Sequence, residues 1–232
     1  MNVTTGIFSE LPAGPQRNDE IPKETAAFMK AASKIFGPDY IGIESALAVG
    51  VSIPAVRAKL LPMGTFRKEM LELHGSWLIV AVPPVSLADI VFARPRYFEK
   101  RERNYLLALP SAQKVAGTWR WLAVRKKTVV GGLPYGLQKK AVIGEERVPT
   151  LVELAWVMVA ARVVKNEILF QNTYIRTSGV RMDGLGLSVR ACLGMNRRNE
   201  GISFREIPDE VSDEFYRLGV VRDITLGAAK TG

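Results

Sequence analysis

The feature that most constrains the fold is a strongly apolar segment, residues 151–170, that opens with a complete helix-start signal. Pro149 and Thr150 precede it, and Glu153 stands three positions after the threonine. A threonine and a glutamate at this spacing can each accept a hydrogen bond from the other's free backbone amide, so the pattern predicts a helix beginning at Thr150. We place the helix at about 150–170 and expect it to be buried, because it is apolar on every side.

A membrane span is the competing interpretation of this segment, and its charges argue against it. The longest uncharged run, residues 154–161, is far shorter than the roughly 20 residues that cross a bilayer. A buried central helix is therefore the prediction.

The rest of the chain alternates between strand and helix patterns. After the apolar segment, residues 173–177, 185–193 and 202–207 read as an antiparallel meander, followed by a short helix at 210–218 and a strand at 220–224. Before it, the pattern predicts an amphipathic helix at 22–36, a strand at 76–82, a short helix opened by Ser86 and Asp89, and a strand at 119–127. The fold class is thus α+β: an N-terminal helical and mixed region, then a long buried helix packed on an antiparallel β-meander.

Three regions follow from these patterns. Residues 1–21 combine Gly, Pro and charges of both signs, and we expect a flexible arm. The turn-rich stretch 131–146 predicts a boundary between an α+β region, 22–146, and a region of helix plus antiparallel strands, 147–232.

Composition sets broad limits on function. A hydrophobic content of 47% supports a folded core, and 32 Lys and Arg against 23 Asp and Glu give a formal net charge of +9. Such a charge favours nucleic acid or an acidic protein as partner, although it also serves solubility. A single cysteine, Cys192, excludes an internal disulfide, so we expect a cytoplasmic protein; the oligomeric state is open.

Residues for the common catalytic chemistries are scarce. His74 is the only histidine, Cys192 lies in an apolar strand pattern, and neither phosphate-binding glycine signature occurs. We expect no catalytic residue, metal or cofactor, and a binding protein rather than an enzyme. A metal-dependent nuclease is a distant third hypothesis, because Asp183, Glu200, Glu206 and Asp209 are dispersed around the C-terminal strands.

Basic residues gather in the middle of the chain. Segment 94–105 interleaves five of them with aromatic residues, and 120–127 holds four more. Cations that follow a phosphate backbone and rings that stack on bases suit single-stranded nucleic acid. The candidate polyanion-binding residues are Arg94, Arg96, Tyr97, Lys100, Arg101, Arg103, Arg120, Arg125, Lys126, Lys127, Lys139 and Lys140. The competing interpretation is a solvated charged face, with aromatic residues such as Trp119 in the core.

Two resemblances extend this picture. Residues 35–41, Ile-Phe-Gly-Pro-Asp-Tyr-Ile, and residues 148–186 resemble an uncharacterised family of bacterial proteins. Residues 187–205, with an Asn- and Arg-rich stretch before Gly-Ile-Ser-Phe-Arg, resemble the end of C-type-lectin-like domains, including target proteins of diversity-generating retroelements. The second resemblance implies a ligand-facing loop at 195–201 made of Asn196, Arg197, Arg198, Asn199 and Glu200.

The first function hypothesis is therefore a non-catalytic protein that binds nucleic acid or another polyanion through a basic surface. The alternative is a C-type-lectin-like module that binds or displays a ligand on the 195–201 loop.

Overall fold

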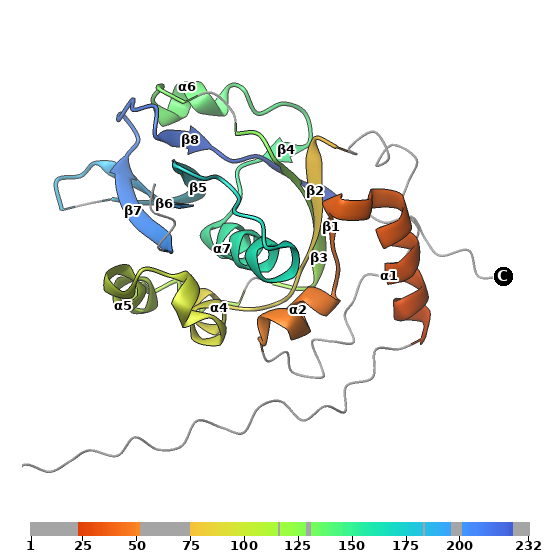
Figure 1. Cartoon of the computed structure of the whole chain (residues 1–232). Coiled ribbons are helices and arrows are strands. Elements are labelled where there is room, and N and C mark those ends of the chain that lie inside the picture. Colours follow the sequence, from red (N-terminus) through yellow and green to blue (C-terminus); the bar gives the residue numbers. More distant parts are fainter. Residues whose placement is uncertain are drawn as a thin grey trace, which may run out of the picture.

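The computed structural model describes residues 23–51, 75–115, 117–128, 131–182, 184–195 and 201–224, with side chains from residue 30 onward (Figure 1). The expected arm at 1–21 and the candidate loop residues 196–200 lie outside this part of the chain. Its longer helices are α1 (Lys23–Phe36), α4 (Leu87–Ala93), α5 (Lys100–Ala108) and α7 (Leu151–Ala160). The shorter ones are α2 (Glu44–Val49), α6 (Tyr135–Lys139) and the 3-10 turns η1 (Gly37–Asp39) and η3 (Pro95–Tyr97).

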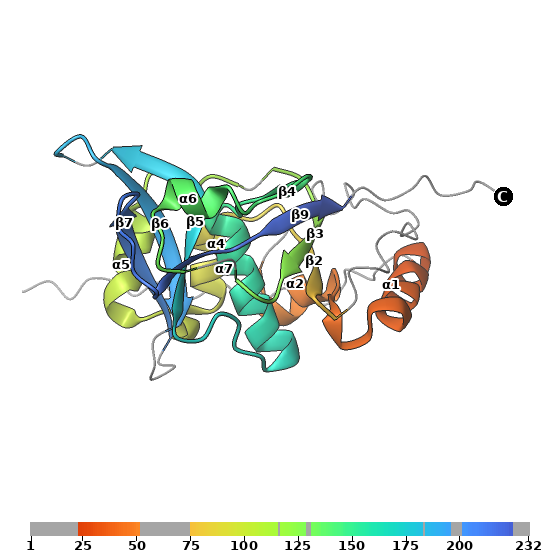
Figure 2. The same cartoon turned by 90° about the horizontal axis from the view of Figure 1, so that it is seen from above.

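The first sheet has the strand order β1-β2-β3-β9-β4. Its members are β1 (Tyr40–Ile41), β2 (Trp77–Val82), β3 (Arg120–Arg125), β4 (Glu146–Arg147) and β9 (Val221–Ile224). Every residue of β2 is buried, as expected of a strand whose two faces are both covered. In Figures 1 and 2, α1 covers the outer face of this sheet and α7 lies on the inner side.

The second sheet contains the predicted meander. Strands β5 (Thr173–Met182), β6 (Ser188–Met195) and β7 (Ile202–Pro208) pair antiparallel in sequence order, which confirms the expectation. A fourth strand, β8 (Tyr216–Leu218), pairs parallel with β5.

The helix predicted at 210–218 was wrong. The end of that segment is β8, because the amide of Tyr174 donates to the carbonyl of Phe215 at 2.8 Å and draws the chain along β5. The carboxylate of Asp213 accepts from the amide of Phe215 at 2.8 Å, a local bond that closes a turn instead of a helix.

Helix α7 lies between the two sheets, as Figure 2 shows from above. The predicted capping box is present: the amide of Thr150 donates to Glu153 at 2.7 Å, and the amide of Glu153 donates to the Thr150 hydroxyl at 3.3 Å. The indole of Trp156 donates to the carbonyl of Ala81 in β2 at 2.8 Å, which ties the helix to the first sheet. The prediction of a buried central helix is confirmed.

The C-terminal end of this helix differs from the prediction. After Ala160 the helix widens into a π-turn, η4 (Ala161–Lys165), and stops at Asn166, which has a left-handed backbone with φ of 53°. Asparagine tolerates this conformation and so can end a helix. The regular helix therefore ends well before residue 170.

One hydrophobic core connects the two sheets. It contains Phe98 and Trp121, which lie within the predicted basic segments, and Trp119, which precedes one of them. Strand β9 pairs with β3 on one side and β4 on the other, so the first sheet takes strands from both sides of the expected 146/147 boundary. Among the described helices, none is long and apolar enough to cross a membrane.

Candidate functional site

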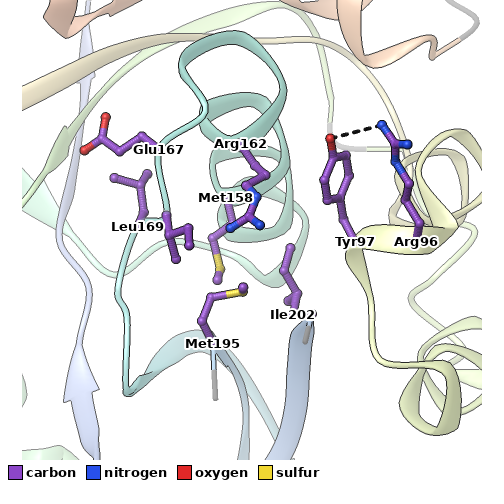
Figure 3. Close-up of a pocket in the computed structure, with 10 residues that line it drawn as sticks. Arg96, Tyr97, Met158, Arg162, Glu167, Leu169, Met195 and Ile202 are labelled. Atoms are coloured by element: carbon purple, nitrogen blue, oxygen red, sulfur yellow. Dashed lines mark hydrogen bonds between the residues drawn. The ribbon is translucent and has the colours of Figure 1, made fainter. Parts of the chain in front are cut away.

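A pocket of about 140 Å³ opens where η3, the end of α7, β6 and β7 meet (Figure 3). We call it the Arg162 pocket. Its lining combines two arginines and a tyrosine with an apolar floor. The lining residues are Arg96, Tyr97, Met158, Arg162, Glu167, Ile168, Leu169, Met195, Gly201 and Ile202.

A close approach between two backbones forms one wall. Phe98 and Ile202 make a parallel bridge, and the amide of Glu99 donates to the carbonyl of Ile202 at 3.1 Å. A Cβ atom on Gly201 would lie 2.9 Å from the Glu99 nitrogen, which is too close for any residue but glycine. Gly201 thereby lets η3 lie against the start of β7, with Tyr97 and the neighbouring Arg96 at the pocket.

The π-turn after α7 supplies a second wall. The amide of Glu167 donates back to the carbonyl of Ala161 at 3.2 Å, which closes the widened turn that carries Arg162. The Nη1 atom of Arg162 is buried and has no hydrogen-bond partner among the described residues. Wide turns of this kind occur frequently at functional sites, and a buried donor without a partner is costly unless a ligand supplies an acceptor.

The third wall comes from the connection between the π-turn and β5. The amide of Asn172 donates to the carbonyl of Met195 at 3.0 Å, which holds this connection beside the end of β6. Phe170 adopts a φ of 56°, unusual for a bulky residue, and its side chain is buried in the core. Leu169, next to it, faces the pocket.

The charge at the pocket is positive. Arg96 is exposed, lies near the ring of Tyr97 at 5.2 Å from its centroid, and donates to the Tyr97 hydroxyl at 3.5 Å. In Figure 3 the carboxylate of Glu167 points away from the centre, whereas the guanidinium of Arg162 points toward it. The site therefore suits a ligand with an acceptor or an anionic group and an apolar body.

The pocket adjoins one of the predicted basic stretches, residues 94–103, which we call the basic segment. Its cations are Arg94, Arg96, Lys100, Arg101 and Arg103. None of the five forms an ion pair within the described part of the chain. Glu102, one of the two acidic residues within the segment, binds Arg205 at 2.7 Å and also accepts from the amide of Phe204.

Three of the predicted cations at β3 have structural partners instead. Arg120 binds the buried Glu153 at 2.9 Å, Arg125 binds the buried Glu146 at 2.8 Å, and Lys126 pairs with Asp39. Ion pairs of this kind neutralise carboxylates that the fold has buried. These three cations are therefore already bound to carboxylates of the same chain.

The remaining predicted cations lie elsewhere. Lys127 follows β3 and is exposed, and Lys139 and Lys140 are exposed at the end of α6. In Figure 1, α6 lies at the top and α5 at the bottom, with the second sheet between them. The structure therefore brings the basic segment together with the Arg162 pocket and leaves the α6 lysines apart from both.

The candidate loop residues, Asn196, Arg197, Arg198, Asn199 and Glu200, lie outside the described residues. The two positions that flank them, Met195 and Gly201, both line the Arg162 pocket. His74 and two of the four carboxylates named for a metal site, Asp183 and Glu200, also fall outside.

The other two carboxylates are bound to cations. Glu206 pairs with Arg181 and accepts from the Tyr105 hydroxyl at 2.7 Å, and Asp209 pairs with Arg190 at 2.8 Å. Over the described ranges, no group of three or more His, Cys, Asp or Glu side chains could hold a metal ion.

Cys192 is fully buried in β6. Its burial raises the pKa of the thiol to about 12, so the thiolate that a nucleophile requires does not form at neutral pH.

Of the residues that line the pocket, Arg96 and Tyr97 are among the candidates named from the sequence, whereas Arg162, Met158 and Leu169 are not. The apolar pattern of 151–170 predicts burial for all of this segment, and in the sequence the charge of Arg162 argues only against a membrane span. Asn166, a residue that tolerates the left-handed conformation, was the signal that the helix ends early.

Comparison with family models, with curated proteins and with solved structures gives no match. The site is therefore interpreted from its own geometry.

Proposed function

We propose that this chain is a non-catalytic protein that binds single-stranded nucleic acid through the basic segment and the adjoining Arg162 pocket. The observation that carries the proposal is the contrast between two groups of cations. Those of β3 neutralise buried carboxylates, whereas the five of the basic segment have no carboxylate partner within the described residues.

Cations without carboxylate partners attract phosphates, because each phosphate contact releases counterions from the strand. Tyr97 lies among these cations and offers a ring to a base, as proteins that bind single strands commonly do. An acidic protein would use the same cations but would have no need of a ring beside them. The net charge of +9 adds long-range attraction to a polyanion.

The test is binding of a fluorescent single-stranded oligonucleotide, DNA and RNA, measured by anisotropy from about 50 to 200 mM salt. We expect affinity to fall steeply with salt in the unmodified protein. The triple variant R96A/K100A/R101A should weaken binding and reduce the slope of log affinity against log salt by about 2, since each contact to a single strand contributes about 0.7.

The matched control is K139A/K140A, which removes exposed cations from α6, apart from the basic segment. In this variant the slope should stay within about 0.5 of its value in the unmodified protein. That change is smaller than the contribution of one phosphate contact. Absence of binding, affinity that ignores salt, or equal losses in both variants would refute the proposal.

A second candidate function is ligand binding by a C-type-lectin-like loop at 195–201. The observation in its favour is that Met195 and Gly201 both line the Arg162 pocket. Its test is a thermal-shift screen against small carbohydrates and organic anions. A ligand that stabilises the unmodified protein but not N196A/R197A/R198A, with an unchanged melting temperature without ligand, would support it; a large stability loss in that variant would contradict it.

A further inference from the structure

The Arg162 pocket has the size and the chemistry of a subsite for one ring. We infer that it receives a single pyrimidine base of a bound strand, while the phosphates follow the basic segment. This inference rests on the proposed function.

The volume sets the size of the occupant. An apolar cavity of about 150 Å³ in another protein holds one benzene molecule. The Arg162 pocket, at about 140 Å³, therefore matches one six-membered ring. A pyrimidine base has that size, and a purine carries one more fused ring.

The lining favours an aromatic ring over an aliphatic group. Figure 3 shows the side chains of Met158 and Met195 pointing toward one another at the centre of the pocket, with Tyr97 at its side. Thioether sulfurs make favourable contacts with aromatic rings, and tyrosine can stack on them. Ile202 and Leu169 close the apolar surface around this position.

The unpartnered donor of Arg162 selects the chemistry of the ring. Its Nη1 atom is buried and lacks an acceptor among the described residues, although the side chain as a whole is only partly buried. Cytosine, thymine and uracil all carry a carbonyl oxygen at position 2, which can accept this hydrogen bond. Adenine has no carbonyl and could accept this hydrogen bond only at a ring nitrogen.

Arg96 connects the pocket to the basic segment. It lines the pocket, is exposed, and lies near the ring of Tyr97. The cations at Lys100, Arg101 and Arg103 continue from η3 into α5. A base that enters the pocket thus leaves its phosphate at Arg96, from which the strand continues past the α5 cations.

The experiment compares three single strands of equal length and charge: oligo-dT, oligo-dA, and a strand of abasic spacers. Binding is measured by anisotropy over the salt range used above. We expect oligo-dT to bind about tenfold more tightly than the abasic strand, as one stacked base would give. The salt slopes should be equal, because the difference lies in the base and not in the phosphates.

Two variants test the pocket itself. Arg162→Met removes the donor, and Leu169→Trp fills the space; each should lower affinity for oligo-dT about tenfold and leave the abasic strand unaffected. Lys165→Met is the matched control, since it removes a cation from the same π-turn that does not line the pocket. The Lys165→Met variant should still bind oligo-dT more tightly than the abasic strand. Arg162→Met keeps the test valid if the tryptophan variant fails to fold.

The outcomes separate the two proposals. If no strand binds with a salt-dependent affinity, the proposed function is wrong and the subsite falls with it. If all three strands bind equally and steeply with salt, strand binding by the basic segment holds and the base subsite is refuted. Saturable binding of benzoate that oligo-dT does not displace would assign the pocket to a free organic anion and also overturn the inference.

Discussion

At the scale of single residues, Glu153 shows how one side chain serves two purposes. Its carboxylate caps α7 through the amide of Thr150, and it also accepts from Arg147 at 2.7 and 2.9 Å and pairs with Arg120 at 2.9 Å. Burial by itself raises the pKa of this carboxyl, but the bonds from Arg147 and Thr150 and the charges of both arginines outweigh it, so the pKa lies below its usual value.

Glu153→Gln tests this network. Because the pKa of Glu153 is lowered by folding, its contribution to stability is fully present above the unfolded-state pKa of about 4.3 and is lost as pH falls through the folded-state pKa. At pH 7 we expect a loss of about 2 kcal/mol in the free energy of unfolding, below the usual cost for breaking a buried pair because both arginines are about a third exposed. The difference between the variant and the unmodified protein should narrow as pH falls below about 4.3 and vanish below the folded-state pKa of Glu153.

The measurement is urea unfolding at pH 7 and at pH 3.5, with Asp223→Asn as the matched control. Asp223 also binds Arg147, at 2.6 Å, but its side chain is 53% exposed. The control should lose less than about 1 kcal/mol. Equal losses of unfolding free energy in both variants at pH 7 would show that Glu153 does not stabilise the fold more than the exposed Asp223 does.

At the scale of elements, one buried arginine helps to hold α6 and the turn after β7 to the second sheet. Arg176 in β5 is fully buried, and its guanidinium donates to the carbonyl of Leu133 at 3.2 Å, the Gln138 side chain at 3.1 Å and the carbonyl of Val211. Burial lowers the pKa of Arg176. Arg176 has no carboxylate in ion-pair contact within the described residues. The neutral oxygens named above accept its hydrogen bonds instead.

Arg176→Met should loosen both segments without disrupting the meander. The variant leaves two backbone carbonyls and an amide oxygen without their donor, while it also removes the cost of burying a charge; we expect a net loss of about 2 to 3 kcal/mol. Hydrogen exchange should accelerate at residues 131–140 and 209–215 and change little in β6. Arg181→Met, a substitution on the exposed half of the same strand, is the control and should cost under about 1 kcal/mol. Uniform acceleration over the whole sheet would contradict the local role of Arg176.

At the scale of the whole molecule, one hydrophobic core spans both sheets, with α7 between them. Strand β9, from the C-terminal end of the described chain, completes the first sheet between β3 and β4. Neither the first sheet nor α7 buries its apolar surface without residues from the other half of the chain.

We therefore expect a single cooperative unfolding transition. Tryptophan fluorescence, which reports on Trp77 in β2, Trp119 and Trp121 at β3 and Trp156 in α7, should change at the same urea concentration as far-UV circular dichroism. Two separated transitions would instead support independent folding of the regions 22–146 and 147–232.

Much of the fold could be predicted from the sequence because its signals are local. The Thr150 and Ser86 caps, the alternation along the meander strands and the stop at Gly37 each depend on residues within a few positions of one another. The parallel strand β8 could not be predicted in this way, because its pairing partner β5 lies some forty residues earlier in the chain.

The sequence by itself predicted the helices α1 and α4, a buried central helix from Thr150, the strands β2 and β3, the meander, and the gathering of cations between 94 and 140, but neither α5 nor β8. Only the tertiary structure decided what those cations do. Arg120 meets Glu153 and Arg125 meets Glu146 through contacts distant in sequence, which occupies their charge. Arg96 and Arg162 instead line the same pocket, one wall of which forms where Gly201 lets two backbones come together. The positions of charged residues in a sequence do not show which residues those charges will contact. The contacts depend on which surfaces the core brings together.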